Sequence, residues 1–235
     1  MNMFLRGAVF LTLLGAAPLT FAGVYQIDDG TVSPAGLGRG YFGALTSVWL
    51  NGFQVQAGME TITTVSIMFG AAPIGDSLPA NGSPVTVVLY TDPTNDGNAV
   101  DGALQRQVAG TVQSADTGTF VDFAIPSITL PAGSWFYVGL AANGTSGTST
   151  FGANIDSDEI PDPSIGGPSF HFGWFTGTPD SSNLSGAAGS TQTAAEVDFM
   201  IRATGVADTG VPEPGTWSMA ALGAALLAGQ RRRRG

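Results

Sequence analysis

The sequence predicts an all-β domain, a two-layer antiparallel β-sandwich of jelly-roll-like topology. Short stretches alternate apolar and polar residues with period two, as half-buried strands do. Turn-forming segments rich in glycine, proline and asparagine separate these stretches, and the 235 residues include 34 Gly and 14 Pro. No ten-residue amphipathic helical stripe interrupts them. Many short strands at this spacing are typical of a sandwich.

Five stretches carry the alternation most clearly. Their apolar sets are Val65/Ile67/Phe69, Val85/Val87/Leu89, Val121/Phe123/Ile125, Phe136/Val138/Leu140 and Val197/Phe199/Ile201. In the last stretch we expect Glu196, Asp198 and Arg202 on the opposite, solvent-facing side. Weaker strand candidates cover residues 24–28, 53–56, 105–112, 150–154 and 169–175. Residues 176–195 are rich in Thr, Ser, Gly and Ala and are expected to form a long loop.

Three segments follow one another along the chain, Thr61–Ser66, Val85–Asp92 and Leu130–Leu140. Their order resembles that in jelly-roll domains of bacterial surface proteins. The resemblance implies a fold and not a function.

The charge distribution excludes several classes of function. All eight basic residues are arginines, and five of them lie in the terminal segments. Residues 23–210 retain three arginines against 17 acids, a net charge of −14. Nucleic-acid binding needs a basic face, so it is not expected. The chain has no cysteine, which excludes disulfides and thiolate metal sites.

Residues 1–22 have the pattern of a secretory signal peptide. Arg6 precedes an apolar stretch at residues 8–14, and small residues surround Ala22. Cleavage by the secretion machinery is predicted after Ala22. The alternative, an N-terminal anchor helix, would need about 20 apolar residues, and this stretch is shorter.

The other end of the chain, residues 211–235, has three parts. Pro-containing residues come first, then an uncharged run at 215–229, then a basic cluster. The motif residues are Val211, Pro212, Glu213, Pro214, Arg231, Arg232, Arg233 and Arg234. The prolines make a stiff segment that suits recognition by a processing enzyme. The apolar run is predicted as a short transmembrane helix that inserts transiently, with the arginines held in the cytoplasm.

This arrangement resembles the PEP-CTERM sorting signal of bacterial exported proteins. The resemblance implies that a membrane-embedded exosortase processes the tail. It also implies delivery to the cell envelope or the extracellular exopolysaccharide matrix. A plain C-terminal anchor is the alternative, but an anchor needs neither the Pro-Glu-Pro segment nor so short an apolar run.

One loop is a candidate calcium site. Calcium takes six to eight oxygen ligands from a sharply bent loop. The candidate ligands around Gly97 are Asp92, Asn95, Asp96, Asn98 and Asp101. The segment is not an EF-hand, because Ala103 stands where the bidentate acid belongs. The alternative is a solvated hairpin loop made of turn-forming residues.

A second acidic group and the single histidine are weaker candidates. The acids Asp156, Asp158, Glu159 and Asp162 fall in one stretch, where we expect them to face solvent as loop acids. A glycosidase would need two such carboxylates across a cleft. His171 is expected to be structural, on the face of its strand opposite Phe170, Phe172 and Trp174.

Four aromatic residues could form a platform on which sugars stack: Trp135, Trp174, Tyr41 and Tyr137. The alternative is that they pack in the core and at its rim.

No nucleophile elbow, phosphate loop, dinucleotide fingerprint or His-Glu-x-x-His motif occurs. The sequence therefore predicts a non-enzymatic, adhesive or structural protein of the envelope or matrix. The alternative is a carbohydrate-binding module of the exopolysaccharide matrix. A third interpretation, an exported hydrolase, would need convergent acids in a deep cleft.

Overall fold

The structure is a computed structural model that describes residues 22–30, 45–70, 81–143, 153, 155–156, 169–175, 180–186 and 198–208. These residues belong to one compact unit, Phe21–Asp208. The predicted signal peptide up to residue 21, the sorting tail and most of the loop at 176–195 lie outside the described residues.

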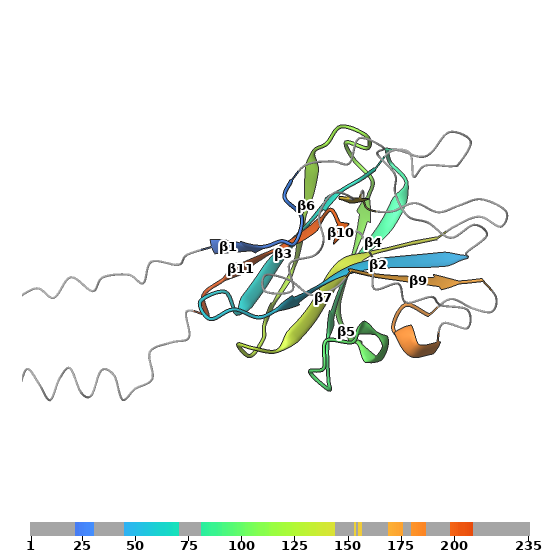
Figure 1. Cartoon of the computed structure of the whole chain (residues 1–235). Coiled ribbons are helices and arrows are strands. Elements are labelled where there is room, and N and C mark those ends of the chain that lie inside the picture. The colour runs from blue at the N-terminus through green and yellow to red at the C-terminus, as the bar shows by residue number, and fades with distance from the viewer. Residues whose placement is uncertain are drawn as a thin grey trace, which may run out of the picture. The chain divides into compact units, whose positions relative to one another are not determined.

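Two antiparallel sheets face each other (Figure 1). The four-stranded sheet has the order β1 (Ala22–Tyr25), β11 (Ile201–Val206), β3 (Thr61–Met68), β6 (Phe120–Thr129). The five-stranded sheet has the order β5 (Ala103–Thr111), β4 (Pro84–Thr91), β7 (Trp135–Asn143), β2 (Thr46–Gln54), β9 (Ser169–Trp174). The short strands β8 (Ile155–Asp156) and β10 (Asp198–Phe199) pair separately. The predicted two-layer antiparallel sandwich is confirmed.

The strand order is compatible with the predicted jelly roll. With β8, β9 and β10 set aside, the sheet β1-β11-β3-β6 faces the sheet β5-β4-β7-β2. Each sheet thus takes strands alternately from the first four of these eight strands (β1 to β4) and from the last four (β5, β6, β7 and β11), as two interleaved Greek keys do. Most contacts are consequently between segments far apart in the sequence.

The core between the sheets is built from the alternating apolar residues. The sets that begin at Val65, Val85 and Phe136 are fully in this core, as are Phe123 and Ile125. Val121 packs against its edge, and Phe199 and Ile201 complete it. The period-two prediction is therefore confirmed for these described positions, because each strand turns alternate side chains toward the facing sheet.

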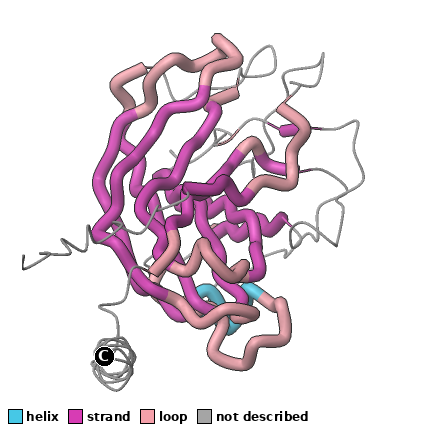
Figure 2. The backbone as a smooth tube through the Cα atoms, turned by 90° about the vertical axis from the view of Figure 1, so that its left-hand side faces the viewer, coloured by secondary structure: helices cyan, strands magenta, loops and turns pink. Residues whose placement is uncertain are grey.

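A second apolar cluster covers the outer face of the five-stranded sheet. It contains Phe170, Phe172 and Trp174 of β9, together with Val48, Leu50, Val88, Tyr90, Ala99, Tyr137, Ala141 and Leu184. Two short 3-10 helices, η1 (Ala99–Asp101) and η2 (Leu184–Gly186), contact each other over this face and are the cyan segments of Figure 2. This sheet is thus covered on both faces over much of its length.

The predicted solvent-facing side of the last strand is wrong at Asp198, whereas Arg202 does lie on the face opposite Ile201, partly exposed. The segment bends at Met200, so Phe199, Met200 and Ile201 are all buried in succession. Asp198 lies inside the domain, fully buried. Arg202 is half-buried and folds onto Asp28. Alternation requires a continuous strand, and the bend between β10 and β11 breaks it.

Candidate functional site

The loop between β4 and β5 brings together the predicted calcium ligands. Asp92, at the end of β4, is only 7% exposed. Its Oδ1 accepts hydrogen bonds from the Thr94 N–H, the Thr94 hydroxyl and the Asn95 N–H. Its Oδ2 accepts from the Gly97 N–H at 2.8 Å and the Tyr137 hydroxyl at 3.1 Å. One carboxylate therefore organises the first half of the loop.

These hydrogen bonds determine the protonation state of Asp92. Burial raises the pKa of a carboxyl group, but the bonds from Gly97, Thr94, Asn95 and Tyr137 favour the carboxylate and lower the pKa of Asp92 overall. The pKa of Tyr137 is raised, first by burial and then by the nearby Asp92 charge. Asp92 is consequently charged and Tyr137 neutral at physiological pH.

The remaining acids of the loop gather around Asp92. Carboxylate oxygens of Asp92, Asp96 and Asp101 lie within 4.8 Å of one another, and the latter two residues are exposed. Asp96 accepts a bond from the Asn98 N–H, and Asp101 accepts one from the Thr94 hydroxyl. Three negative charges this close repel one another, which a bound cation would relieve.

The two asparagines of the predicted calcium set have other roles. The Asn98 side chain caps η1 by accepting from the Val100 N–H. The Asn95 side chain accepts a 2.8 Å bond from the N–H of Trp135, the first residue of β7. Of the five predicted ligands, the three carboxylates lie together, while the two amide oxygens hold neighbouring backbone.

Trp135 forms one wall of the same loop. Gly97 has φ +80°, and a Cβ built there would lie 3.5 Å from the indole ring. The left-handed backbone therefore favours glycine at this position, while the indole ring would be in ordinary van der Waals contact with a Cβ. Trp135 is half-buried, so part of its ring remains accessible beside the acidic cluster.

The structure separates the two tryptophans predicted to stack on sugars. Along β2, Gln54 pairs with Trp135 and Thr46 pairs with Trp174. Eight residues of strand correspond to about 27 Å. Trp174 is 3% exposed and belongs to the outer apolar cluster, as does Tyr137. Tyr41 lies outside the described residues. The aromatic residues therefore do not meet as one platform.

A polar cluster inside the sandwich joins the two sheets. The side-chain amide of Asn51 on β2 donates to the carbonyls of Phe199 and Ile201 at 2.6 and 2.9 Å. Its oxygen accepts from the hydroxyl of Ser169, which also reaches Asp198 at 3.4 Å. The two carbonyls flank the bend at Met200. The cluster therefore holds the chain where its alternation breaks.

The second acidic group differs from its prediction. Asp156 is fully buried on β8, where it pairs with Asp198 across the ladder and accepts a 3.4 Å bond from the Asp29 N–H. It does not face solvent as a loop acid would. Asp158, Glu159 and Asp162 lie outside the described residues. A strand that buries polar residues has no alternation that sequence reasoning could detect.

His171 lies on the inner face of β9, opposite Phe170 and Phe172, as predicted. Its ring stacks on Trp49 with centroids 5.0 Å apart and is 2% exposed. His171 is therefore part of the packing between β9 and β2.

An ion pair that the sequence did not predict joins Arg202 to Asp28. Arg202 Nε lies 3.1 Å from both oxygens of the fully buried Asp28 carboxylate, and a second guanidinium nitrogen also contacts Oδ1. The guanidinium covers the Phe120 ring at 4.0 Å. The one available signal was that only three arginines remain in the domain. The partners lie 174 positions apart, so no local pattern joins them.

The comparisons with known proteins identify the tail. The family model described as the PEP-CTERM protein-sorting motif matches residues 210–234. No curated protein and no solved structure matches the chain. Within the described residues, no helix is both long and apolar enough to cross a membrane, and the predicted apolar run at 215–229 lies outside them.

Fold and tail together define the class of this protein, an exported protein with a β-sandwich domain. The chain carries a PEP-CTERM sorting signal at residues 210–234, as predicted. It is therefore sorted by exosortase and is anchored at, or released from, the cell envelope.

Proposed function

We propose that the exported domain is a non-enzymatic component of the cell envelope or extracellular matrix, with an adhesive or structural role. One observation carries the proposal. The sorting motif follows a domain in which the carboxylates of Asp92, Asp96 and Asp101, the one such cluster among the described residues, belong to a loop that Asp92 holds together. Asp92 accepts five hydrogen bonds from that loop and from Tyr137. Its lowered pKa is the reverse of what a general acid needs at neutral pH.

The other resolved pKa shifts support the same proposal. The pKa values of the partly exposed Glu60 and the exposed Asp180 are lowered, by hydrogen bonds from Gly58 and Ser182 respectively. Burial raises the pKa values of Tyr25 and Tyr90, further from neutrality. Active sites instead bring pKa values toward the working pH. These four side chains therefore fit roles in holding the fold and keeping the domain soluble.

The experiment combines fractionation with an activity panel. We expect the exported protein, purified from producing cells, to leave polysaccharide, ester and peptide substrates unchanged. We also expect it in the envelope or matrix fraction. Turnover that survives repurification and disappears when Asp156, Asp158, Glu159 or Asp162 is replaced would overturn the proposal in favour of a hydrolase.

A carbohydrate-binding module is the second candidate function. It is favoured by a groove on the outer face of the five-stranded sheet, whose described lining residues are uncharged and include the hydroxyl groups of Thr46, Thr86 and Ser181. Such a module would attach the protein to the exopolysaccharide of the matrix without chemistry of its own. The half-buried ring of Trp135 gives a separate aromatic surface, at the opposite end of β2.

A further inference from the structure

The groove lies on the outer face of the five-stranded sheet, beyond the part of that face on which the segments of η1 and η2 pack. Across this face, Ala109 of β5, Thr86 of β4 and Ala141 of β7 are directly opposed, and Val48 of β2 continues the row. Directly opposed residues of antiparallel strands point to the same face. Since Val48 belongs to the outer apolar cluster, the whole row points outward.

Small side chains in this row create the hollow. The neighbouring rows carry Leu50, Val88 and Phe170, and farther along Tyr90 and Tyr137, which the segments around η1 and η2 cover. Alanine and threonine at the groove leave about 450 Å³ unfilled. This volume falls within the range of small-molecule sites.

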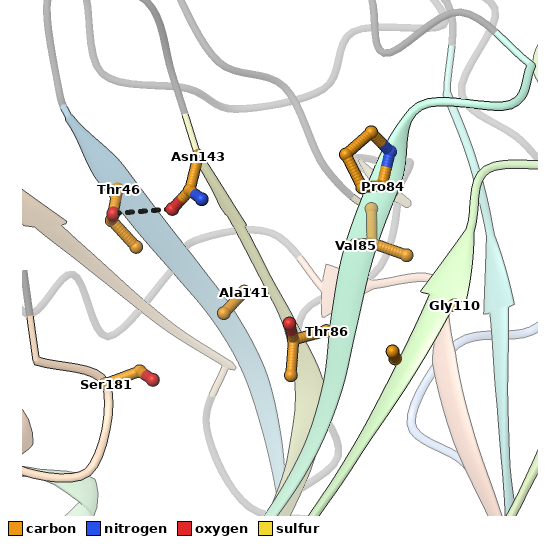
Figure 3. A pocket seen from close by; sticks show the side chains of 9 residues that line it. Thr46, Pro84, Val85, Thr86, Gly110, Ala141, Asn143 and Ser181 are labelled. Atoms are coloured by element: carbon orange, nitrogen blue, oxygen red, sulfur yellow. Dashed lines mark hydrogen bonds between the residues drawn. The ribbon is translucent and has the colours of Figure 1, made fainter.

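Hydrogen-bonding groups surround the hollow. Thr46 and Asn143 face each other at the strand ends, and Ser181 lines the hollow from the covering segment (Figure 3). The Thr46 hydroxyl donates a 2.9 Å bond to Asn143 Oδ1, which fixes the orientation of the amide. Within the described part of the chain, the Asn143 side-chain nitrogen and the Thr86 hydroxyl make no protein hydrogen bond. The described residues therefore leave both groups available to a ligand.

We propose that this groove binds a segment of a neutral polysaccharide. The inference deepens the second candidate function and rests on it. None of the described lining residues is charged, so these residues offer no partner for an ionic ligand. Threonine, serine and asparagine both donate and accept hydrogen bonds, as sugar hydroxyls require. Ala109, Ala141 and Pro84 supply apolar surface for the carbon faces of a sugar ring.

Charge and backbone pairing exclude the nearest alternatives. Residues 23–210 carry a net charge of −14, with three arginines against 17 acids, and would repel an acidic polysaccharide at moderate salt. An extended peptide is usually bound by the free edge of a sheet. At the groove, β4 pairs with β5 and β7, and β7 also pairs with β2. β5 is the edge strand of the sheet, but its free side faces away from β4, so an added peptide strand would lie beside the groove and not on its floor.

The test uses the exported protein and calorimetric titration with dextran, cellohexaose, laminarihexaose and mannohexaose, with alginate as the acidic comparator. We expect at least one neutral probe to bind and alginate not to bind. The Ala109→Arg substitution places a long side chain in the groove and should weaken binding at least about tenfold. Ala124→Arg is the matched control, because Ala124 is also an exposed alanine, on β6 of the other sheet.

A second variant keeps the shape of the site. Asn143→Asp retains the size of the side chain but removes its two donors, and should also weaken binding about tenfold. Thermal unfolding of each variant verifies the fold. The inference is overturned if no neutral probe binds, if alginate binds more tightly, or if both groove variants bind like Ala124→Arg. None of these three binding results would contradict an adhesive or structural role. That role would be contradicted by a different result, turnover in the substrate panel.

Discussion

The hydroxyl of Tyr137 donates a 3.1 Å hydrogen bond to Oδ2 of Asp92, across 45 positions of sequence. Tyr137 belongs to the apolar cluster on the outer face of the five-stranded sheet, and Asp92 organises the acidic loop. The bond therefore joins the loop to the sheet. A similar bond, from the Tyr90 hydroxyl to the Ser181 carbonyl, joins the segment of η2 to the same face.

The Asp92→Ala substitution should destabilise the domain by about 3 kcal/mol, because it leaves several loop donors without their acceptor. Tyr137→Phe removes one of the five bonds and should cost about 1–2 kcal/mol. Urea unfolding measures both values. Asp122→Asn, an exposed acid on β6, is the control and should cost less than about 0.5 kcal/mol. Equal costs for Asp92→Ala and Asp122→Asn would contradict the organising role of Asp92.

The lowered pKa of Asp92 predicts how stability depends on pH. Its pKa is lower in the folded state than in the unfolded state, where it is about 3.9. The unfolded state therefore binds the proton first, and the contribution of Asp92 is complete above about pH 4 and is lost as the pH falls through the folded pKa. Unfolding curves between pH 7 and pH 2.5 should converge for wild type and Asp92→Asn at the acid end. A constant difference would contradict this linkage.

The buried ion pair predicts a non-additive result. Arg202→Leu leaves the Asp28 carboxylate buried without its cation and should cost about 3 kcal/mol. The double variant Asp28→Asn/Arg202→Leu removes the charge but keeps an acceptor for the Gly30 N–H, so it should cost less than the single variant. Urea unfolding of the two variants decides the matter. A double variant that is less stable than Arg202→Leu would show that the uncompensated charge of Asp28 is not the main cost of removing Arg202.

Calcium binding by the loop remains a prediction that thermal unfolding can test. Asp92 already accepts five bonds, so Asp96 and Asp101 would supply most of the protein ligands. At ten times its dissociation constant, calcium adds about 1.4 kcal/mol. That corresponds to a rise of about 3–6 °C in Tm for a domain of this size. Asp96→Ala should abolish the rise, and Asp122→Ala should keep it. A Tm that calcium leaves unchanged would favour the plain hairpin loop.

The alternation of apolar residues predicted the strands that face the core, but not those covered on both faces. β2 runs from Thr46 to Gln54, and all but its last residue are buried. The sequence signal began only at Phe53, because a strand buried on two sides has no polar face to alternate with. The outer cluster was not predicted for the same reason.

The candidate loop could be predicted because its residues lie close together in the sequence. The density of Asp, Asn and Gly between Asp92 and Asp101 indicates a turn with clustered oxygens, and the structure groups its three carboxylates. Residues that meet in the fold but lie far apart in the sequence left no such local pattern. Asn51 meets Phe199 from 148 positions away, and the groove depends on register across β5, β4 and β7.

The central claim is that the cell exports this β-sandwich and processes its tail, leaving a component of the envelope or matrix. Ala22 begins β1 and pairs with Val206, so cleavage after Ala22 leaves Gly23 in the first strand. The most direct measurement is the intact mass of the protein in the envelope and matrix fractions. We predict a mature protein that begins at Gly23 and lacks Arg231–Arg234, and retention of an unprocessed form when those arginines are deleted. A chain that still begins at Met1 in those fractions, or unchanged processing and location after the deletion, would contradict the account.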